Sequence, residues 1–230
     1  AVLTYVAGQR AVLPKGVCTK PPLRVRIARA INRQAASPSG WFGRLLGYIW
    51  PREQGRLNAE VLDQLDVQPS QSVLEIGSGS GHALREAARR ARDGQVVGID
   101  VSELMVRLAR DRNRQGTARG NVDVRVGDVA SLSLAGSTFD RIFSVHCIYF
   151  WRDVECTLAK LAAALRPQGK LVLAFRPDGE DVPARFRDPT YRFPRMEDLR
   201  VTLARAGLEV DRAESSISEP GVLIVTAARR

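Results

Sequence analysis

The stretch Glu75-Ile76-Gly77-Ser78-Gly79-Ser80-Gly81-His82-Ala83 decides the fold of this chain. It follows the strand-like run Ser72-Val73-Leu74 and precedes a helix-like stretch that extends to Arg92. The order is therefore strand, glycine turn and helix. Glycines at alternate positions let a ligand lie against bare backbone, where a Cβ would clash. The new helix N-terminus offers unpaired N–H groups beside that ligand.

The spacing of the glycines separates two kinds of cofactor. The dinucleotide fingerprint is G-x-G-x-x-G, with an acid near the end of the next strand. Here the order is Gly77-x-Gly79-x-Gly81, and the sixth position is His82. An NAD(P) oxidoreductase is therefore disfavoured. A sharp turn that binds no ligand is the alternative for the isolated motif.

Composition and cysteine usage narrow the class of protein. A chain of 230 residues with 44% apolar residues fits one globular α/β domain with attachments. It contains no run of 18 or more apolar residues, so no membrane span is predicted. Cys18, Cys147 and Cys156 form neither a CxxC pair nor zinc spacing. We therefore expect reduced thiols, a cytoplasmic protein and no metal site.

The charge of the chain is uneven. Its formal net charge is +10, yet residues 1–52 hold nine Lys or Arg and no acid, while the remainder has 26 bases against 25 acids. We therefore expect residues 1–56 to form a basic arm with a helical lid, and residues 57–230 to form the ligand-binding domain. A basic arm attracts nucleic acid, anionic membrane or an acidic substrate, and the alternative is a solvated surface.

The chain from residue 54 onward alternates helix-like and strand-like segments. Apolar, β-branched runs predict strands at 72–76, 96–100, 122–126, 141–145, 170–175, 208–213 and 221–226. Helical periodicity predicts helices at 23–34, 54–65, 82–92, 102–114, 153–165 and 196–206. This alternation indicates a parallel sheet with helices on both faces.

Two acids follow strands of that sheet, where doubly wound folds bind ligands. Asp100 ends the second strand and is placed to accept hydrogen bonds from both hydroxyls of a ribose. A helix cap is the alternative role, but Ser102 fits the cap better. Asp128 ends the third strand, where it can accept a hydrogen bond from an adenine amino group while Val129 packs on the ring. Taken alone, this segment predicts only a turn.

Two motifs in this arrangement resemble those of a known family. Glu75 with the three glycines is similar to the E/D-x-G-x-G-x-G motif of class I S-adenosylmethionine (SAM) methyltransferases. The turn from Leu165 to Leu173 resembles their L-R/K-P-G-G-x-L motif, with Gln168 in place of a glycine. The order of motifs resembles the UbiE-like, small-molecule branch. The resemblance implies a three-layer Rossmann-like sheet, mostly parallel with an antiparallel last strand, in the order 3-2-1-4-5-7-6.

The resemblance also implies SAM as cofactor, S-adenosylhomocysteine as product, and a set of cofactor residues. The groups expected around the methionine part of SAM are Glu75, Gly77, Ser78, Gly79 and Gly81. Those expected around ribose and adenine are Asp100, Val101, Met105, Asp128 and Val129, although a core role is the alternative for Met105. Ser144 and Val145 are expected to line the passage toward the acceptor.

His146 follows the fourth strand and is the candidate base. Histidine titrates near neutral pH, which suits removal of a proton from a hydroxyl. The alternative is a pocket-lining residue that takes no proton. Aromatic side chains suit a flat, apolar acceptor and exclude water. We therefore expect the acceptor pocket to contain Trp41, Tyr48, His146, Tyr149 and Trp151, with core packing as the alternative for the aromatic residues.

The sequence thus predicts O- or C-methylation of a small molecule, of the secondary-metabolite or quinone and lipid type. A first alternative is an RNA methyltransferase steered by the basic arm, with nucleic acid as partner. The segment Ser144-Val145-His146-Cys147 lacks the (D/N)-P-P-(Y/F) tetrad of base N-methyltransferases, which disfavours that chemistry. A second alternative is a SAM-binding protein that does not methylate, or a cyclase. The sequence leaves a homodimer open.

Overall fold

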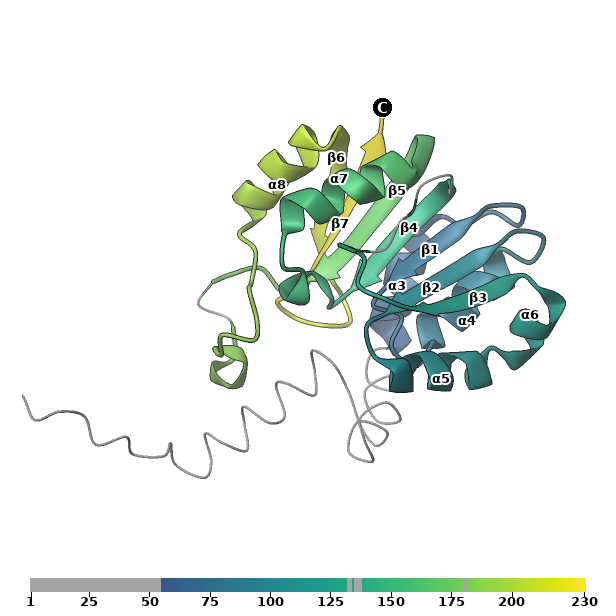
Figure 1. Ribbon diagram of the computed structural model, residues 1–230. Helices are drawn as coiled ribbons and strands as arrows, with labels where there is room; N and C mark the ends of the chain where they lie inside the picture. The colour runs from purple at the N-terminus through teal and green to yellow at the C-terminus, as the bar shows by residue number, and fades with distance from the viewer. Residues whose placement is uncertain (1–54, 132–133, 135–137, 180–181) are drawn as a thin grey trace, which may run out of the picture.

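The computed structural model describes residues 55–131, 134, 138–179 and 182–230. These residues fold into a seven-stranded sheet with helices on both faces (Figure 1). The strands are β1 Val73–Ile76, β2 Val96–Asp100, β3 Val122–Val126, β4 Phe139–Val145, β5 Leu165–Phe175, β6 Leu208–Ser215 and β7 Leu223–Arg229. The α-helices are α3 Gly55–Leu65, α4 His82–Arg90, α5 Glu103–Arg112, α6 Arg114–Arg119, α7 Val154–Ala164 and α8 Met196–Arg205. Two short 3₁₀ helices are η1 Ile148–Phe150 and η2 Ala184–Phe186.

The strand order is β3-β2-β1-β4-β5-β7-β6, which confirms the predicted topology. Strands β1 to β5 pair in parallel, and β7 runs antiparallel to both β5 and β6. The carboxyl ends of β1 to β5 therefore lie at one edge of the sheet (Figure 1). Parallel sheets of this kind bind ligands at that edge.

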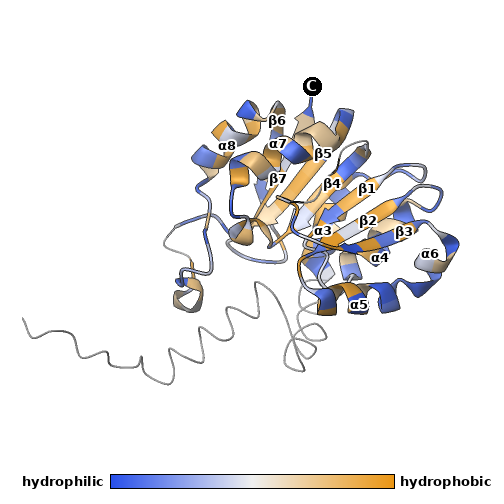
Figure 2. Cartoon of the chain, viewed as in Figure 1, coloured by the Kyte–Doolittle hydropathy of each residue, from blue (hydrophilic) through white to orange (hydrophobic). Residues whose placement is uncertain are grey.

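Two apolar layers hold the helices against the sheet. Successive side chains of a strand point to opposite faces, so Val73 packs with α3, α4 and α5, while its neighbour Leu74 packs with α7 and α8. Strand β5 repeats this alternation with Leu171, Val172 and Leu173. Figure 2 shows hydrophobic central strands and helices in which hydrophobic and hydrophilic residues are mixed.

Most predicted elements match, with shifts at their ends. The predicted helix 102–114 is divided into α5 and α6, and β5 begins at Leu165 rather than at residue 170. Between Phe139 and Arg141 the pairing of β4 with β5 shifts register, because the turn after Leu165 inserts residues into β5. The predicted basic helix 23–34, the residues Trp41 and Tyr48, and the proposed lid lie outside the described residues.

None of the helices in the described part of the chain combines the length and the apolar character that crossing a membrane requires.

Candidate cofactor and acceptor site

The glycine loop has the backbone geometry that its sequence predicts. Gly77, Gly79 and Gly81 all have positive φ, at 74°, 50° and 77°. A Cβ at Gly77 would lie 2.6 Å from Cys147 Sγ, and a Cβ at Gly81 would lie 2.7 Å from Asn113 Nδ2. Glycine is therefore needed at both positions for conformation and for space.

Glu75 carries the clearest sign of a missing partner. Its side chain is buried, and Oε2 has no hydrogen-bond partner among the described residues. Burial, and then the nearby charge of Asp100, raise the pKa of Glu75 well above its ordinary value, although a backbone hydrogen bond from Leu84 opposes the rise. Ser78 Oγ is a second buried atom that lacks a partner there. A buried acceptor without a partner is costly, and it fits a ligand that brings a cationic donor.

Asp100 joins the glycine loop to α5. One carboxylate oxygen accepts a hydrogen bond from Gly79 N at 2.8 Å, and the other accepts from Ser102 N at 2.8 Å. Burial raises the pKa of Asp100 above its ordinary value. Ser102 caps α5, as predicted, by accepting a hydrogen bond from Met105 N at 3.3 Å. Each carboxylate oxygen has a second acceptor position, so these bonds leave capacity for two ligand hydroxyls.

The residues predicted around adenine lie beside Asp100. Val101 is 49% exposed, which is unusual for a large apolar side chain next to a buried strand. Gly127 N donates to Asp100 O at 2.9 Å and so brings the end of β3 to the end of β2. Asp128 accepts from Ala130 N at 2.9 Å in a turn, and Val129 is buried. Met105, in contrast, is only 4% exposed and clusters with α5 residues, so its surface for a ligand is small.

Strand β4 ends in a sharp turn. Ser144 is buried, and its hydroxyl donates to Ile76 O at 2.9 Å, which ties β4 to β1. Val145 is half-buried. His146 then has φ of 52°, a left-handed conformation that is uncommon outside glycine, while its N–H donates to Ala174 O at 2.8 Å. This backbone is held by the neighbouring strand, and strain of this kind is frequent at functional sites.

Both ring nitrogens of His146 are engaged by protein groups. Nδ1 lies 3.0 Å from Tyr149 Oη, and Nε2 lies 3.1 Å from Glu219 Oε2. Arg176 N–H donates to Tyr149 Oη, so the tyrosine proton is left to donate to Nδ1. We therefore assign the tautomer with hydrogen on Nε2, which donates to Glu219.

Glu219 comes from the loop between β6 and β7, far along the chain from His146. The hydrogen bond from His146 lowers the pKa of Glu219 below its ordinary value, as does the charge of Arg176, and burial opposes both. The Arg176 guanidinium lies 3.8 Å from the Glu219 carboxylate and also donates to Pro220 O at 2.9 Å. These contacts close the loop over the end of β4.

A second carboxylate anchors the same loop from outside. Glu60, on α3, accepts from Ile217 N at 3.0 Å, from Ser218 N at 2.8 Å and from Ser216 Oγ at 3.0 Å. The sequence reasoning missed Glu60, Arg176 and Glu219. No local motif marks them, because each contacts the site only after distant elements have packed together.

Two of the residues predicted for the acceptor pocket are buried. Tyr149 is 4% exposed and Trp151 is 5% exposed, and both belong to the core cluster beneath α7 and α8. The structure therefore places both side chains in the core. Cys147 lies between them and the glycine loop, and burial raises the pKa of its thiol to about 12.

Comparison with known proteins agrees with this geometry. Residues 73–169 match a family model described as a methyltransferase domain. The uncharacterized methyltransferase YdaC of Bacillus subtilis is 31% identical over 137 residues, which are 60% of this chain and 74% of YdaC. The O-methyltransferase rstn1 of Aspergillus nomiae is 28% identical over 163 residues, which are 67% of this chain and 72% of that protein. Other matching methyltransferases are longer, and the chain spans 40 to 44% of three of them.

Solved structures show the same fold. A SAM-dependent methyltransferase from Aquifex aeolicus superposes with a TM-score of 0.65 over 87% of this chain and 98% of that one, at 20% identity. Phosphoethanolamine N-methyltransferase 2 of Haemonchus contortus, in complex with S-adenosyl-L-methionine, has a TM-score of 0.62 and 25% identity over 69% of this chain and 38% of that one. With the sheet order, the glycine loop and the likeness to YdaC in agreement, the chain belongs to the class I SAM-dependent methyltransferases.

Proposed function

We propose that the chain transfers a methyl group from SAM to a hydroxyl of a small-molecule acceptor. The observation that carries this proposal is the buried, unpartnered oxygen of Glu75 beside the glycine loop. An anionic acceptor in that place suits the cationic amino group of the methionine part of SAM. The name of the O-methyltransferase from Aspergillus nomiae supports a hydroxyl acceptor. Membership of the UbiE-like branch and a cytoplasmic location stay predictions.

The described residues fit the rest of the cofactor. The Asp100 carboxylate has capacity for the ribose hydroxyls, and the exposed side chain of Val101 offers an apolar surface to the adenine ring. Asp128 stands at the neighbouring strand end for the adenine amino group. SAM would supply a methyl group on its sulfonium sulfur; the acceptor oxygen would take this methyl in line, and S-adenosylhomocysteine would leave. The main tasks of the protein are therefore to orient the two reactants and to exclude water.

The proton of the acceptor hydroxyl needs a destination. His146 alone has no open lone pair in the described geometry, because Nδ1 accepts from Tyr149 and Nε2 carries the hydrogen that points to Glu219. If Tyr149 Oη turns its hydrogen away, Nδ1 can take the proton from the acceptor hydroxyl, and the Glu219 carboxylate, which still accepts from Nε2, stabilises the resulting imidazolium. We therefore assign His146, supported by Glu219, as the proton acceptor.

Calorimetry with SAM and S-adenosylhomocysteine tests the cofactor directly, and absence of binding at millimolar SAM would overturn the proposal. Turnover is then followed as S-adenosylhomocysteine formed from a panel of phenols. The matched variant is His146→Asn, because asparagine tolerates the left-handed backbone that alanine would strain. We expect it to lower the rate by about a hundredfold with unchanged SAM affinity.

The alternatives predict different results in the same assays. A protein that binds SAM without methylating, or a cyclase, would bind SAM and never form S-adenosylhomocysteine. C-methylation would show methyl on carbon in the product. An RNA methyltransferase steered by residues 1–52 would bind RNA with strong salt dependence, and replacing the nine basic residues there would abolish that binding.

A further inference from the structure

A long loop follows β5, and none of the cofactor residues lies in it. Residues 178–179 and 182–194 are the described part of this loop between β5 and α8, and a hydrogen bond from Asp178 N to Pro194 O at 3.0 Å joins its ends. A loop of this length with joined ends is an Ω-loop, which is packed by its own side chains and is frequently functional. In Figure 1 it lies beyond the carboxyl ends of β4 and β5.

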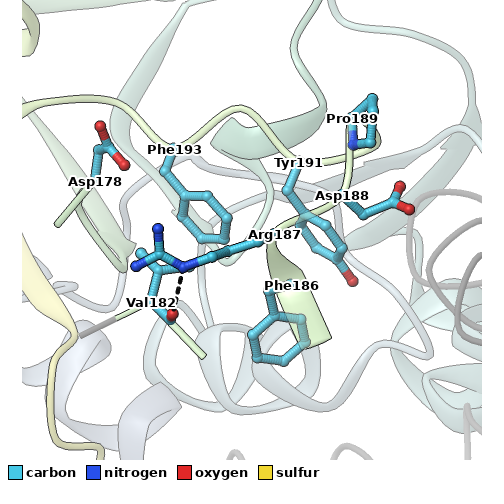
Figure 3. Close-up of a pocket in the computed structure, with 8 residues that line it drawn as sticks. All are labelled: Asp178, Val182, Phe186, Arg187, Asp188, Pro189, Tyr191 and Phe193. Atoms are coloured by element: carbon cyan, nitrogen blue, oxygen red, sulfur yellow. Dashed lines mark hydrogen bonds between the residues drawn. The ribbon is translucent and has the colours of Figure 1, made fainter. Parts of the chain in front are cut away.

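The loop surrounds a hollow with a cavity volume of about 360 Å³. Figure 3 shows its lining, in which aromatic rings form one wall. Tyr191 and Phe193 are stacked, with ring centroids 5.8 Å apart and planes 17° apart. Phe186 meets Tyr191 edge-on at 5.4 Å. The other lining residues are Asp178, Val182, Arg187, Asp188 and Pro189.

The hollow adjoins the proposed methyl-transfer site. Tyr149 contacts Phe193 at a centroid distance of 4.9 Å and Tyr191 at 6.1 Å. On its other side Tyr149 stacks with His146 at 6.0 Å. Arg192 N also donates to Tyr149 O at 3.1 Å, which fastens the loop to η1. A single buried ring therefore separates the wall of the hollow from His146.

Two of the three charged residues of the lining, Arg187 and Asp188, bond within the loop itself. Arg187 donates to Val182 O and to Gly179 O, both at 3.2 Å. The Asp188 carboxylate accepts from Thr190 N at 3.0 Å and from Thr190 Oγ1 at 2.6 Å. A charged ligand would lose hydration here and would have to compete for these groups, whereas an uncharged ring would gain the aromatic wall.

We propose that this hollow, which lies on the other side of Tyr149 from His146, binds an uncharged aromatic ring of the acceptor. The inference rests on the proposed function, because it identifies the acceptor side of the same site. A volume of about 360 Å³ is at the lower end of ligand cavities, which suits one or two fused rings. The acceptor class is thus a small phenol-type compound rather than an anionic or quaternary ammonium compound.

Three probes that share one ring system test the inference in the full chain. They are 2-naphthol, which is uncharged at pH 7, 2-naphthoate and (2-naphthylmethyl)trimethylammonium. We expect 2-naphthol to bind about tenfold more tightly than either charged probe by calorimetry. Equal or tighter binding of a charged probe overturns the proposed chemistry of the hollow.

Two substitutions at Tyr191 distinguish loss of the aromatic ring from loss of the folded structure. Tyr191→Leu should weaken 2-naphthol binding about fivefold to tenfold, because it removes a ring from the wall. Tyr191→Phe keeps the ring and should bind as the wild type does. If the leucine variant does not fold, hydrogen exchange on the wild type decides, because 2-naphthol should then protect amides within 178–194. Protection confined to residues 41–50 or to α8 overturns the inference.

SAM calorimetry on the same variants keeps the two proposals apart. Normal SAM binding by wild type and by Tyr191→Leu, with no 2-naphthol binding by wild type, overturns the aromatic site and leaves the methyltransferase proposal standing. Absence of SAM binding overturns the proposed function, whatever 2-naphthol does.

Discussion

The carboxyl edge of the sheet has two halves that are built in opposite ways. At the ends of β1 to β3, Glu75 Oε2 and Ser78 Oγ are buried without a partner among the described residues. At the ends of β4, β5 and β7, the polar groups of His146, Tyr149 and Glu219 are bonded to one another. The first half, which we assign to the cofactor, has buried polar atoms that a ligand can bond. In the second half, which we assign to the acceptor, the three polar side chains bond one another.

This difference has a cost in stability. A buried carboxyl oxygen that lacks a partner, as Glu75 Oε2 does among the described residues, destabilises the ligand-free protein, because no hydrogen bond offsets the desolvation of that oxygen. The acceptor half stabilises itself instead through bonds between distant segments, from Glu60 on α3 to Ser218 beside Glu219. Binding of the cofactor should therefore raise the free energy of unfolding strongly, whereas binding of an acceptor should raise it little.

Replacing Asp100 should give the largest fall in SAM affinity and should leave the acceptor half unchanged. Asp100→Ala removes a carboxylate that bonds Gly79 and Ser102 and is assigned to the ribose. We expect SAM affinity to fall at least about a hundredfold and the free energy of unfolding to fall by about 2 kcal/mol. Calorimetry and urea unfolding measure both, and 2-naphthol binding should stay unchanged.

Asp123→Ala is the matched control for that experiment. Asp123 on β3 is exposed and pairs with Arg125 at 2.6 Å, so its loss should change stability by less than about 0.5 kcal/mol. Full SAM binding by Asp100→Ala would show that the cofactor half has been misassigned.

Glu75→Gln should lower cofactor affinity and yet stabilise the ligand-free protein. The pKa of Glu75 is raised in the folded state, so its protonated form adds stability at low pH that is lost as pH rises through the folded pKa. Glutamine does not titrate, so the variant should be more stable at neutral pH by about 1 kcal/mol, or 2 to 4 °C in Tm. SAM affinity should fall about tenfold to a hundredfold.

The raised pKa of Glu75 also predicts that the protein releases a proton when SAM binds. A cationic amino group beside Glu75 favours the carboxylate, so wild type should release a proton on binding SAM and Glu75→Gln should not. Calorimetry in buffers that differ in ionisation enthalpy measures this. An enthalpy that is independent of the buffer in wild type would contradict the assignment of Glu75 to the amino group.

The two halves also differ in how far the sequence predicts them. Gly77, Asp100 and Asp128 each follow a strand within a local motif, and strand ends meet because parallel strands share an edge. Their placement therefore follows from short-range pattern and topology. Glu219 and Arg176 follow no motif. The contact of Glu219 with His146, and that of Arg176 with Glu219, arise only when β5, β6 and β7 have assembled. Tyr149 was predicted in the pocket because aromatic type was visible, whereas its burial depended on the loop 178–194.

Glu219→Gln should have a smaller effect that depends on pH. The pKa of Glu219 is lowered from 4.5 in the folded state, chiefly by the hydrogen bond from His146. Its carboxylate therefore contributes stability above the unfolded pKa, and this is lost as pH falls through the folded pKa. Because the side chain is 35% exposed, we expect the variant to be less stable by at most about 1 kcal/mol above pH 5, with the difference vanishing in acid.

Urea unfolding between pH 3 and pH 7 measures that difference. Glu214→Gln is the control, since Glu214 forms an exposed ion pair with Arg212 at 3.4 Å and should contribute little at any pH. SAM affinity should be unchanged in both variants. A constant difference across the pH range would contradict a role for the ionised Glu219 in closing the acceptor half.

The smallest expected effect on stability compares two residues with a strained, left-handed backbone, one inside the His146 network and one in an exposed turn. Gln168 and His146 share the left-handed conformation, with φ of 63° and 52°. Gln168 is exposed in the turn where the family motif has glycine, so Gln168→Gly should relieve the strain and raise stability by about 0.5 kcal/mol, or 1 to 2 °C in Tm. His146→Gly gains the same relief but loses the bonds to Tyr149 and Glu219, so it should be less stable than wild type. Calorimetric melting of both variants measures the contrast. If both were stabilised, the His146 network would contribute nothing to the fold, and the acceptor half would be no more self-supporting than the cofactor half.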